Sequence, residues 1–173
     1  MTLLSHHVEA HCVTSVAPVD AASIRTVVRA DLLSVLRIER AVFAQPWTME
    51  AFEQFLDEPG FLVAEAPASA AVSGGEILGY VVATGIRVNG RVMGHVKDIA
   101  VAPEHQGAGL GSRLLERALS VLANRGFDLV RLEVREGNER AIDLYERFGF
   151  RQVQTYPGYY PDGEDALILH APL

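Results

Sequence analysis

The chain has 173 residues, of which 49% are apolar and 21% charged, proportions that indicate a folded globular protein rather than a disordered chain. Its net charge of −7 argues against a nucleic-acid partner bound through a broad basic surface. No apolar run reaches the roughly 18 residues of a membrane span. Cys12 is the only cysteine, so an internal disulfide is excluded and we expect a cytoplasmic protein with no membrane partner.

The N-terminal segment shows no periodicity. We expect residues 1–22 to form a disordered extension ahead of one domain over residues 23–173. Potential metal ligands lie in this extension: His6, His7, His11 and Cys12. A metal site with four-residue histidine spacing needs a helix, and nothing in this segment predicts one, so we expect no metal.

Helical and extended patterns then follow one another with no linker that would divide two cores. The predicted helices cover residues 32–43 behind Asp31, 49–56 behind Thr48, 110–125, and a segment that Asn138 opens and Gly149 closes. The predicted strands cover residues 24–29, 61–66, 77–88, 91–101, 129–135, 150–156 and 166–170. Asn89-Gly90 indicates a tight antiparallel hairpin between the third and fourth strands. This order predicts one mixed α/β sheet.

A glycine-rich loop connects the fourth strand to the next helix and reads Gln106-Gly107-Ala108-Gly109-Leu110-Gly111. Where no Cβ intervenes, successive backbone N–H groups can turn toward an anion. The helix that follows adds the positive end of its dipole. The loop is therefore a candidate pyrophosphate site.

Two nucleotide-binding motifs compete with this interpretation. A P-loop needs lysine followed by serine or threonine after its last glycine, and Ser112-Arg113 does not supply them. A dinucleotide-binding fold places an acidic residue about 20 residues on, where this chain has Glu133. In that fold the first glycine follows the strand almost directly, whereas five residues separate Val101 from Gly107. A third interpretation is that the glycines only shape a tight connection between the strand and the helix.

The segment 99–111 resembles the coenzyme A motif of GNAT acetyltransferases: Gln or Arg, two residues, Gly, one residue, then Gly or Ala. The resemblance implies that the loop amides hold the pyrophosphate of acetyl-CoA and that the pantetheine arm lies along the preceding strand. The implied cofactor contacts are Ile99, Ala100, Val101, Gln106, Gly107, Ala108, Gly109, Leu110, Gly111 and Ser112. Family members often carry Arg at the position of Gly107, so one cationic phosphate contact is missing there.

A second block, residues 132–150, resembles the RimI branch of this family and its archaeal and eukaryotic N-terminal acetyltransferase relatives. With the glycine-rich loop and the C-terminal tyrosines, the resemblance covers about residues 92–173. It implies a single-domain α/β GNAT fold, whose mixed, mostly antiparallel sheet is splayed between strands 4 and 5 and flanked by helices. It also implies that Asn138 contacts coenzyme A while it caps its helix.

Attack of an amine on a thioester requires a neutral amine, a stabilised oxyanion and a protonated leaving thiolate. By resemblance, Glu133 is the general base, Tyr145 is the general acid, and a backbone N–H near Ile99 or Ala100 meets the oxyanion. By residue pattern alone, Glu133 is an ordinary solvated glutamate beside arginines on one strand face. By the same criterion, Tyr145 is a core aromatic at helical spacing.

Two further segments bear on the acceptor. Residues 158–166 resemble the hairpin that folds over the substrate peptide in N-terminal acetyltransferases, with Tyr159 and Tyr160 as its contacts. Pro46 and Trp47 resemble the opposite wall of that groove; a surface hairpin and a core tryptophan are the alternatives. We therefore expect acetylation of a protein N-terminus, for example that of a ribosomal protein. A small-molecule amine, a lysine side chain and a non-catalytic coenzyme A-binding module are the alternatives.

Overall fold

The computed structural model describes residues 19–68, 75–88 and 90–173. In this part of the chain, seven strands form one sheet in the order β1-β2-β3-β4-β5-β7-β6. Neighbouring strands run antiparallel except for β4 and β5, which are parallel. The expected α/β domain with a mixed, mostly antiparallel sheet is confirmed.

The strands are β1 (Ser23–Thr26), β2 (Gly60–Glu65), β3 (Ile77–Val88), β4 (Arg91–Val101), β5 (Leu129–Arg135), β6 (Arg151–Tyr156) and β7 (Ala166–Pro172). The predicted bounds of β3, β4 and β5 agree with the structure to the residue. The other strands differ at their ends by up to three residues. The largest difference is in β1, because a short 3-10 turn, η2 (Arg29–Asp31), takes up the end of the predicted strand.

The helices are α1 (Leu32–Val42), α2 (Met49–Glu53), α3 (Leu110–Asn124) and α4 (Glu139–Arg147), and no described helix is long and apolar enough to cross a membrane. Helix α2 ends three residues before its predicted end. Two predicted caps are confirmed: Thr48 Oγ1 accepts from the Ala51 N–H at 3.3 Å, and Asn138 Oδ1 accepts from the Ala141 N–H at 3.1 Å.

The prediction that the side chain of Asp31 caps α1 is wrong. Asp31 stands at the N-terminus of α1, but its side chain makes no bond to that helix. The carboxylate instead accepts from the Arg25 guanidinium at 2.7 and 2.9 Å and from the Val28 N–H at 2.8 Å. Asp31 therefore joins the start of α1 to β1.

The predicted disordered extension is wrong for residues 19–22. Val19–Ala21 form a 3-10 turn, and Ala22 is buried. Arg113, in the first turn of α3, donates to the Val19 carbonyl at 2.8 Å and to the Ala22 carbonyl at 2.5 Å. This guanidinium attaches the segment to the fold. Residues 1–18, with their histidines and Cys12, lie outside the described residues.

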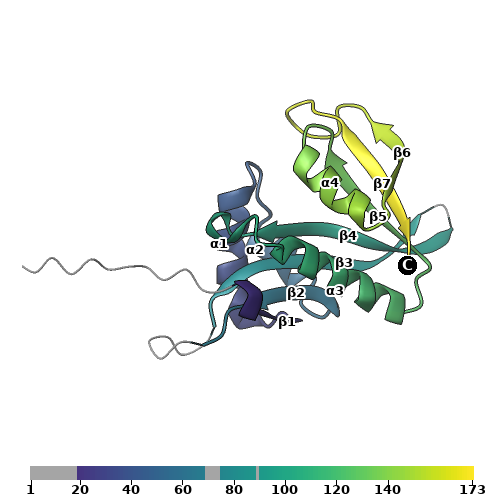
Figure 1. Cartoon of the computed structure of the whole chain (residues 1–173). Coiled ribbons are helices and arrows are strands. Elements are labelled where there is room, and N and C mark those ends of the chain that lie inside the picture. Colours follow the sequence, from purple (N-terminus) through teal and green to yellow (C-terminus); the bar gives the residue numbers. More distant parts are fainter. Residues whose placement is uncertain (1–18, 69–74, 89) are drawn as a thin grey trace, which may run out of the picture.

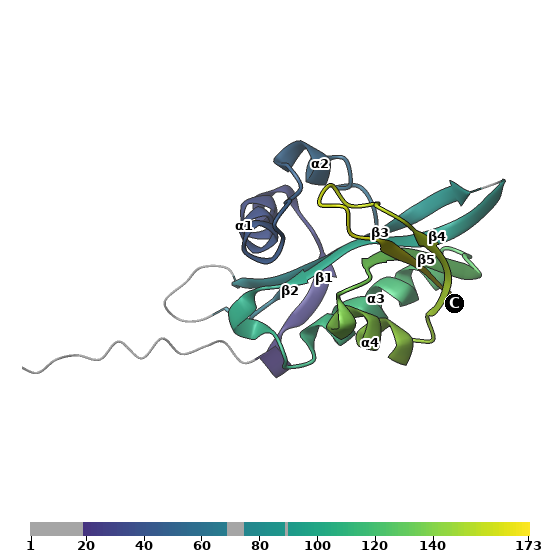
Figure 2. The same cartoon turned by 90° about the horizontal axis from the view of Figure 1, so that it is seen from above.

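Helices cover both faces of the sheet: α1 and α2 lie on one face and α3 and α4 on the other (Figure 2). Helix α3 packs Leu114, Leu115 and Leu122 against the sheet from positions at helical spacing. On the opposite face, Phe52 of α2 packs against the ring of Tyr80. A central strand such as β3 is consequently apolar over most of its length instead of alternating.

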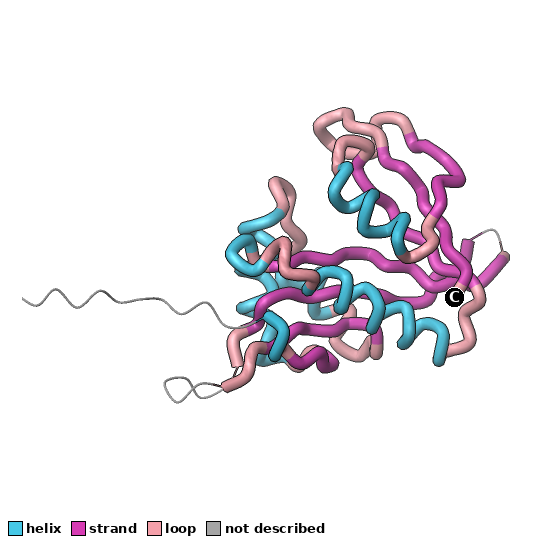
Figure 3. The backbone as a smooth tube through the Cα atoms, viewed as in Figure 1, coloured by secondary structure: helices cyan, strands magenta, loops and turns pink. Residues whose placement is uncertain are grey.

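The sheet opens between β4 and β5. Their pairing is limited to Gly94–Val96 with Val130–Leu132, although β4 continues to Val101 and β5 to Arg135. Beyond Val96, β5, β7, β6 and α4 diverge from the rest of the sheet (Figures 1 and 3). The predicted splay between strands 4 and 5 is confirmed, and it leaves unpaired peptide groups along the second half of β4.

Candidate functional site

A pocket of about 850 Å³ opens where β4 and β5 part. Its walls come from both faces of the sheet: the end of α1, the glycine-rich loop, α4 and the loop before β7. Most of the predicted site residues line it: Trp47, Ile99, Ala100, Val101, Gln106, Gly107, Gly109, Leu110, Gly111, Ser112, Glu133, Asn138, Tyr145 and Tyr160. Three predicted residues are not part of its lining: Pro46, Ala108 and Tyr159.

The glycine-rich loop has the backbone geometry of an anion site. Gly107 and Gly109 have φ angles of +85° and +82°, a left-handed conformation that side chains rarely adopt. Gly109 directly precedes Leu110, the first residue of α3. The first N–H groups of a helix have no partner within it, so those of Leu110 to Ser112 are free to bind an anion in the pocket.

A cation approaches this loop from another element. Arg140 of α4 donates through Nη1 to Gln106 Oε1 at 3.2 Å, and Gln106 in turn donates to the Val101 carbonyl at 3.0 Å. The Arg140 guanidinium also lies beside Gly107, 3.9 Å from the point where a Cβ would stand. The positive charge that Gly107 cannot provide is therefore available from α4.

Glu133 is held by two neighbours on the α1 face of the sheet. Its Oε1 accepts from Arg131 Nε at 2.7 Å, and its Oε2 lies 2.5 Å from His95 Nε2. Burial by itself raises the pKa of Glu133, but the bonds from His95 and Arg131 outweigh burial and leave the pKa lowered. The side chain is only 16% exposed, so Glu133 is not fully solvated, but it does pair with an arginine, as the alternative interpretation expected. Sequence reasoning did not identify His95.

Tyr145 reaches the pocket from α4, on the opposite face of the sheet. It is buried and packs against Phe150 with ring centroids 5.7 Å apart. Burial, followed by the charge of Asp98, raises the pKa of the Tyr145 phenol, so the hydroxyl keeps its proton. Because the strands part here, Tyr145 and Glu133 line one pocket.

A second polar cluster, Glu39, Tyr80 and Asp98, was not predicted. Tyr80 Oη lies within hydrogen-bond distance of Glu39 Oε2 and 2.8 Å from Asp98 Oδ2. Glu39 is 1% exposed, and its other oxygen accepts from the Trp47 N–H at 2.7 Å. Glu39 and Asp98 both line the pocket. The one signal in the sequence was a glutamate at helical spacing among the apolar residues of α1.

Arg135 fixes the loop between β6 and β7 over the pocket. Its Nη1 donates to Asp162 at 2.8 Å and to Glu164 at 2.6 Å, and its guanidinium lies 3.8 Å from the centre of the Tyr160 ring. Burial raises the pKa of Tyr160 to about 12. Tyr160 lines the pocket, whereas Tyr159 points outward and is 54% exposed.

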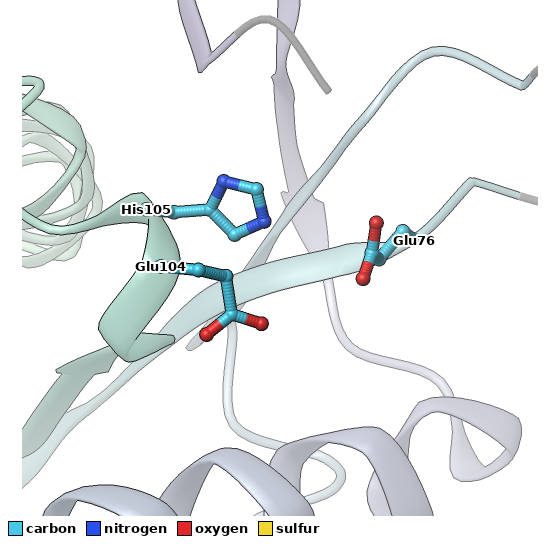
Figure 4. A group of neighbouring side chains, drawn as sticks. All are labelled: Glu76, Glu104 and His105. Atoms are coloured by element: carbon cyan, nitrogen blue, oxygen red, sulfur yellow. The ribbon is translucent and has the colours of Figure 1, made fainter. Parts of the chain in front are cut away.

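One group of described residues offers ligand atoms that a metal ion could share. Figure 4 shows Glu104 and His105 after β4, with Glu76 before β3, around a common gap. Their ligand atoms lie within 4.8 Å of one another, and both glutamates are exposed. Exposed acidic groups often gather without an ion. The expectation that no metal takes part stays a prediction.

Comparison with known proteins identifies the family. The sequence matches the acetyltransferase (GNAT) family over residues 32–150, more than half of the chain. An N-alpha-acetyltransferase of Sulfolobus acidocaldarius is 33% identical over 161 residues, which cover 87% of this chain and 92% of that protein. The chain therefore belongs to the GNAT family of acetyltransferases, which confirms the expected family and class of enzyme.

Solved structures agree with the fold. The ribosomal-protein-S18-alanine N-acetyltransferase from Escherichia coli is 30% identical, with a TM-score of 0.72 over 87% of this chain and 93% of that chain. Arabidopsis thaliana NAA60 in complex with acetyl-CoA is 19% identical, with a TM-score of 0.78 over 88% of this chain and 99% of that chain. At this lower identity the likeness concerns the fold.

Proposed function

We propose that this enzyme transfers the acetyl group of acetyl-CoA to the N-terminal α-amine of a protein. The observation that carries the proposal is the single pocket at the sheet opening, which joins a phosphate-binding loop on one face to Glu133 and Trp47 on the other. The names of the Sulfolobus and E. coli relatives support an N-terminal acceptor, and the latter suggests a ribosomal protein as one candidate.

The cofactor lies on the α3 and α4 side of the opening. The N–H groups of the glycine-rich loop bind the diphosphate, and Arg140 adds a positive charge beside it. The pantetheine arm then runs along β4 from Val101 toward Ile99, where peptide groups lack a partner in β5. The backbone N–H of Ile99 or Ala100 is the donor that we propose for the oxyanion of the tetrahedral intermediate. The Arabidopsis structure, which is a complex with acetyl-CoA, supports acetyl-CoA as the cofactor.

Chemistry takes place where the two faces meet. Glu133, with His95 beside it, assists the loss of the proton from the acceptor ammonium, directly or through a water molecule. The neutral amine attacks the thioester carbonyl, and the departing thiolate takes a proton from Tyr145. Tyr145 suits this role because its pKa is raised and its hydroxyl is therefore protonated at neutral pH.

The acceptor peptide enters from the α1 and α2 side. Trp47 and Tyr160 stand on different walls of this part of the pocket and can enclose the first residues of an extended chain. Of the four predicted acceptor contacts, these two keep their assignment. Pro46 and Tyr159 are assigned no contact, because neither lines the pocket.

The test is incubation of the protein with acetyl-CoA and a library of short peptides that contain an internal lysine, followed by fragmentation mass spectrometry. We expect acetylation at the α-amine. Acetylation confined to lysine side chains, or turnover of small amines only, would contradict the proposed acceptor. Binding of acetyl-CoA without any turnover would favour a non-catalytic coenzyme A-binding module.

A further inference from the structure

The Glu39–Tyr80–Asp98 cluster must hold one proton more than its phenol supplies. The Tyr80 hydroxyl contacts a carboxyl oxygen on each side, Glu39 Oε2 and Asp98 Oδ2. A phenol has one proton and can donate to only one of them. The second contact is a hydrogen bond only if the other carboxyl group is protonated and donates to the phenol oxygen. One of the two acids is therefore neutral.

The contacts of the two acids indicate that Asp98 carries this proton. Both oxygens of Glu39 accept hydrogen bonds, one from the Trp47 N–H and one from Tyr80, as expected for an ionised carboxylate. Burial and then the charge of Glu39 raise the pKa of Asp98 to about 8, although the contact with Tyr80 and the hydrogen bond from the Ile99 N–H act in the opposite direction. Asp98 therefore exchanges its proton near neutral pH.

A β-bulge places Asp98 at the sheet opening. In the pairing of β3 with β4, Val82 opposes Asp98 and Ala83 opposes Val96, so Lys97 is an extra residue. Asp98 is thus two residues beyond the last β4 residue that pairs with β5, and Glu133 stands on the other side of the opening. The titratable groups around Asp98 are Glu39 of α1, Tyr80 of β3, Tyr145 of α4, Glu133 of β5, and Lys97 and His95 of β4.

We propose that Asp98 is a further catalytic residue, which takes the proton from the acceptor ammonium while Glu133 stays ionised and holds that ammonium in place. This inference rests on the proposed function and refines the role of Glu133 within it. Tyr80 and Glu39 are positioning residues, because they fix the Asp98 carboxyl group and act on the acceptor only through it.

In the proposed step, an N–H bond of the ammonium breaks and an O–H bond forms at ionised Asp98. The electron pair left on nitrogen forms the C–N bond with the thioester carbonyl carbon. The C–S bond then breaks, and the thiolate takes its proton from Tyr145. The nitrogen, which still carries two protons after the C–N bond has formed, gives one of them to the Tyr145 phenolate as the amide forms, so Tyr145 is reprotonated. Asp98 returns its proton to solvent before the next cycle.

The proton affinities of the two carboxyl groups support this division of roles. A protein α-amine has a pKa of about 7.7 to 8.0, close to that of Asp98, so proton transfer between them is nearly balanced. The lowered pKa of Glu133 makes the same transfer to Glu133 strongly uphill. Two carboxyl groups with opposite pKa shifts across one pocket are a common basis for separate catalytic roles.

Asp98→Asn tests the proposal with two acceptors. Asparagine keeps the size of the side chain but cannot take a proton. For a peptide with an ordinary N-terminus, we expect kcat to fall on the order of 100-fold at about pH 8, with unchanged affinity for acetyl-CoA. For a peptide with fluorine atoms beside its amine, which is already neutral at this pH, we expect a loss below about fivefold. Asp128→Asn, the same change at an exposed position, is the matched control.

Equal losses with both acceptors would indicate a structural role and overturn the proposal, as would full activity of Asp98→Asn with the ordinary peptide. If the wild-type enzyme acetylates no peptide α-amine, the proposed function itself fails, which is a separate outcome.

A measurement on the wild-type enzyme covers the case in which Asp98→Asn does not fold. Carbon NMR of protein labelled at the aspartate carboxyl carbons should show one resonance that titrates near about pH 8 instead of about pH 4. We expect this resonance to be absent from folded Asp98→Asn protein. A wild-type spectrum in which every aspartate titrates at acidic pH would overturn the proposal.

Discussion

The two sides of the sheet opening are built in different ways. On the α3 and α4 side, the site consists mainly of backbone groups from one continuous segment, residues 106–112. On the α1 and α2 side, it consists of side chains from α1, β3, β4 and β5, such as Glu39, Tyr80, Asp98 and Glu133. Under the proposed function, cofactor binding is thus a local property of the chain. The acceptor chemistry, by contrast, depends on the tertiary fold.

The largest expected effect is on kcat and concerns Tyr145, which reaches the pocket from α4. Tyr145→Phe should lower kcat on the order of 10²- to 10³-fold, because the thiolate then leaves without a proton donor. Steady-state kinetics and calorimetry with acetyl-CoA provide the measurement, and the binding affinity should not change. The ring remains packed against Phe150, so the melting temperature serves as the folding control. Activity within threefold of wild type would remove Tyr145 from the mechanism.

The next effect is on acetyl-CoA binding and concerns a loop glycine, because the cofactor side consists mainly of backbone groups. Gly109→Ala should weaken acetyl-CoA binding about tenfold, since a side chain at φ +82° costs roughly 1 to 3 kcal/mol and disturbs the loop N–H groups. Gly111→Ala is the matched control: its new Cβ would lie 3.8 Å from Leu144 and 3.9 Å from Val101, ordinary contacts. Calorimetry should separate the two variants, and equal affinities would show that the strained glycine is not required.

A smaller effect tests Arg140, the cation assigned to the cofactor side. Arg140→Gln should weaken acetyl-CoA binding about three- to tenfold at low salt and less at high salt, because an exposed charge is screened. Acetyl-pantetheine, which lacks the diphosphate, should bind to the variant and the wild type alike. A similar loss for both ligands would place Arg140 away from the phosphates.

The smallest effect distinguishes two neighbouring tyrosines on the acceptor side. Tyr160→Phe should raise the peptide KM about threefold to tenfold, the effect of one lost hydrogen bond. Tyr159→Phe should stay within about twofold of wild type, because Tyr159 is exposed outside the pocket. Peptide kinetics at saturating acetyl-CoA measure both. The reverse order would mean that the loop closes over the acceptor with a different register.

Sequence reasoning worked best where structure is locally determined. The bounds of β3, β4 and β5 and the caps Thr48 and Asn138 follow from neighbouring residues, and so does the glycine-rich loop. The catalytic assignments of Glu133 and Tyr145 came from family resemblance and stay predictions. From the residue pattern alone, these two side chains looked like a surface acid and a core aromatic.

The residues that sequence reasoning missed are brought together by contacts between distant segments of the chain. Glu39 and Tyr80 are 41 residues apart, and His95 and Glu133 are 38 apart. A single sequence gives no sign that such side chains meet, because their contact follows from strand order and from the packing of α1 on the sheet. Arg140 was missed for the same reason, since the motif specifies a cation within the loop and here it comes from α4.

Finally, the bulge at Lys97 determines toward which face of the sheet each side chain in the second half of β4 points. Side chains alternate between the two faces of a strand, so if Lys97 paired regularly with Val82 instead of forming the bulge, the second half of β4 would turn over. The carboxyl group of Asp98 would then face α3, and Ile99 would take its place beside Tyr80. A shift of the β3–β4 pairing by one residue would thus exchange a polar acceptor wall for an apolar one, with the sequence unaltered.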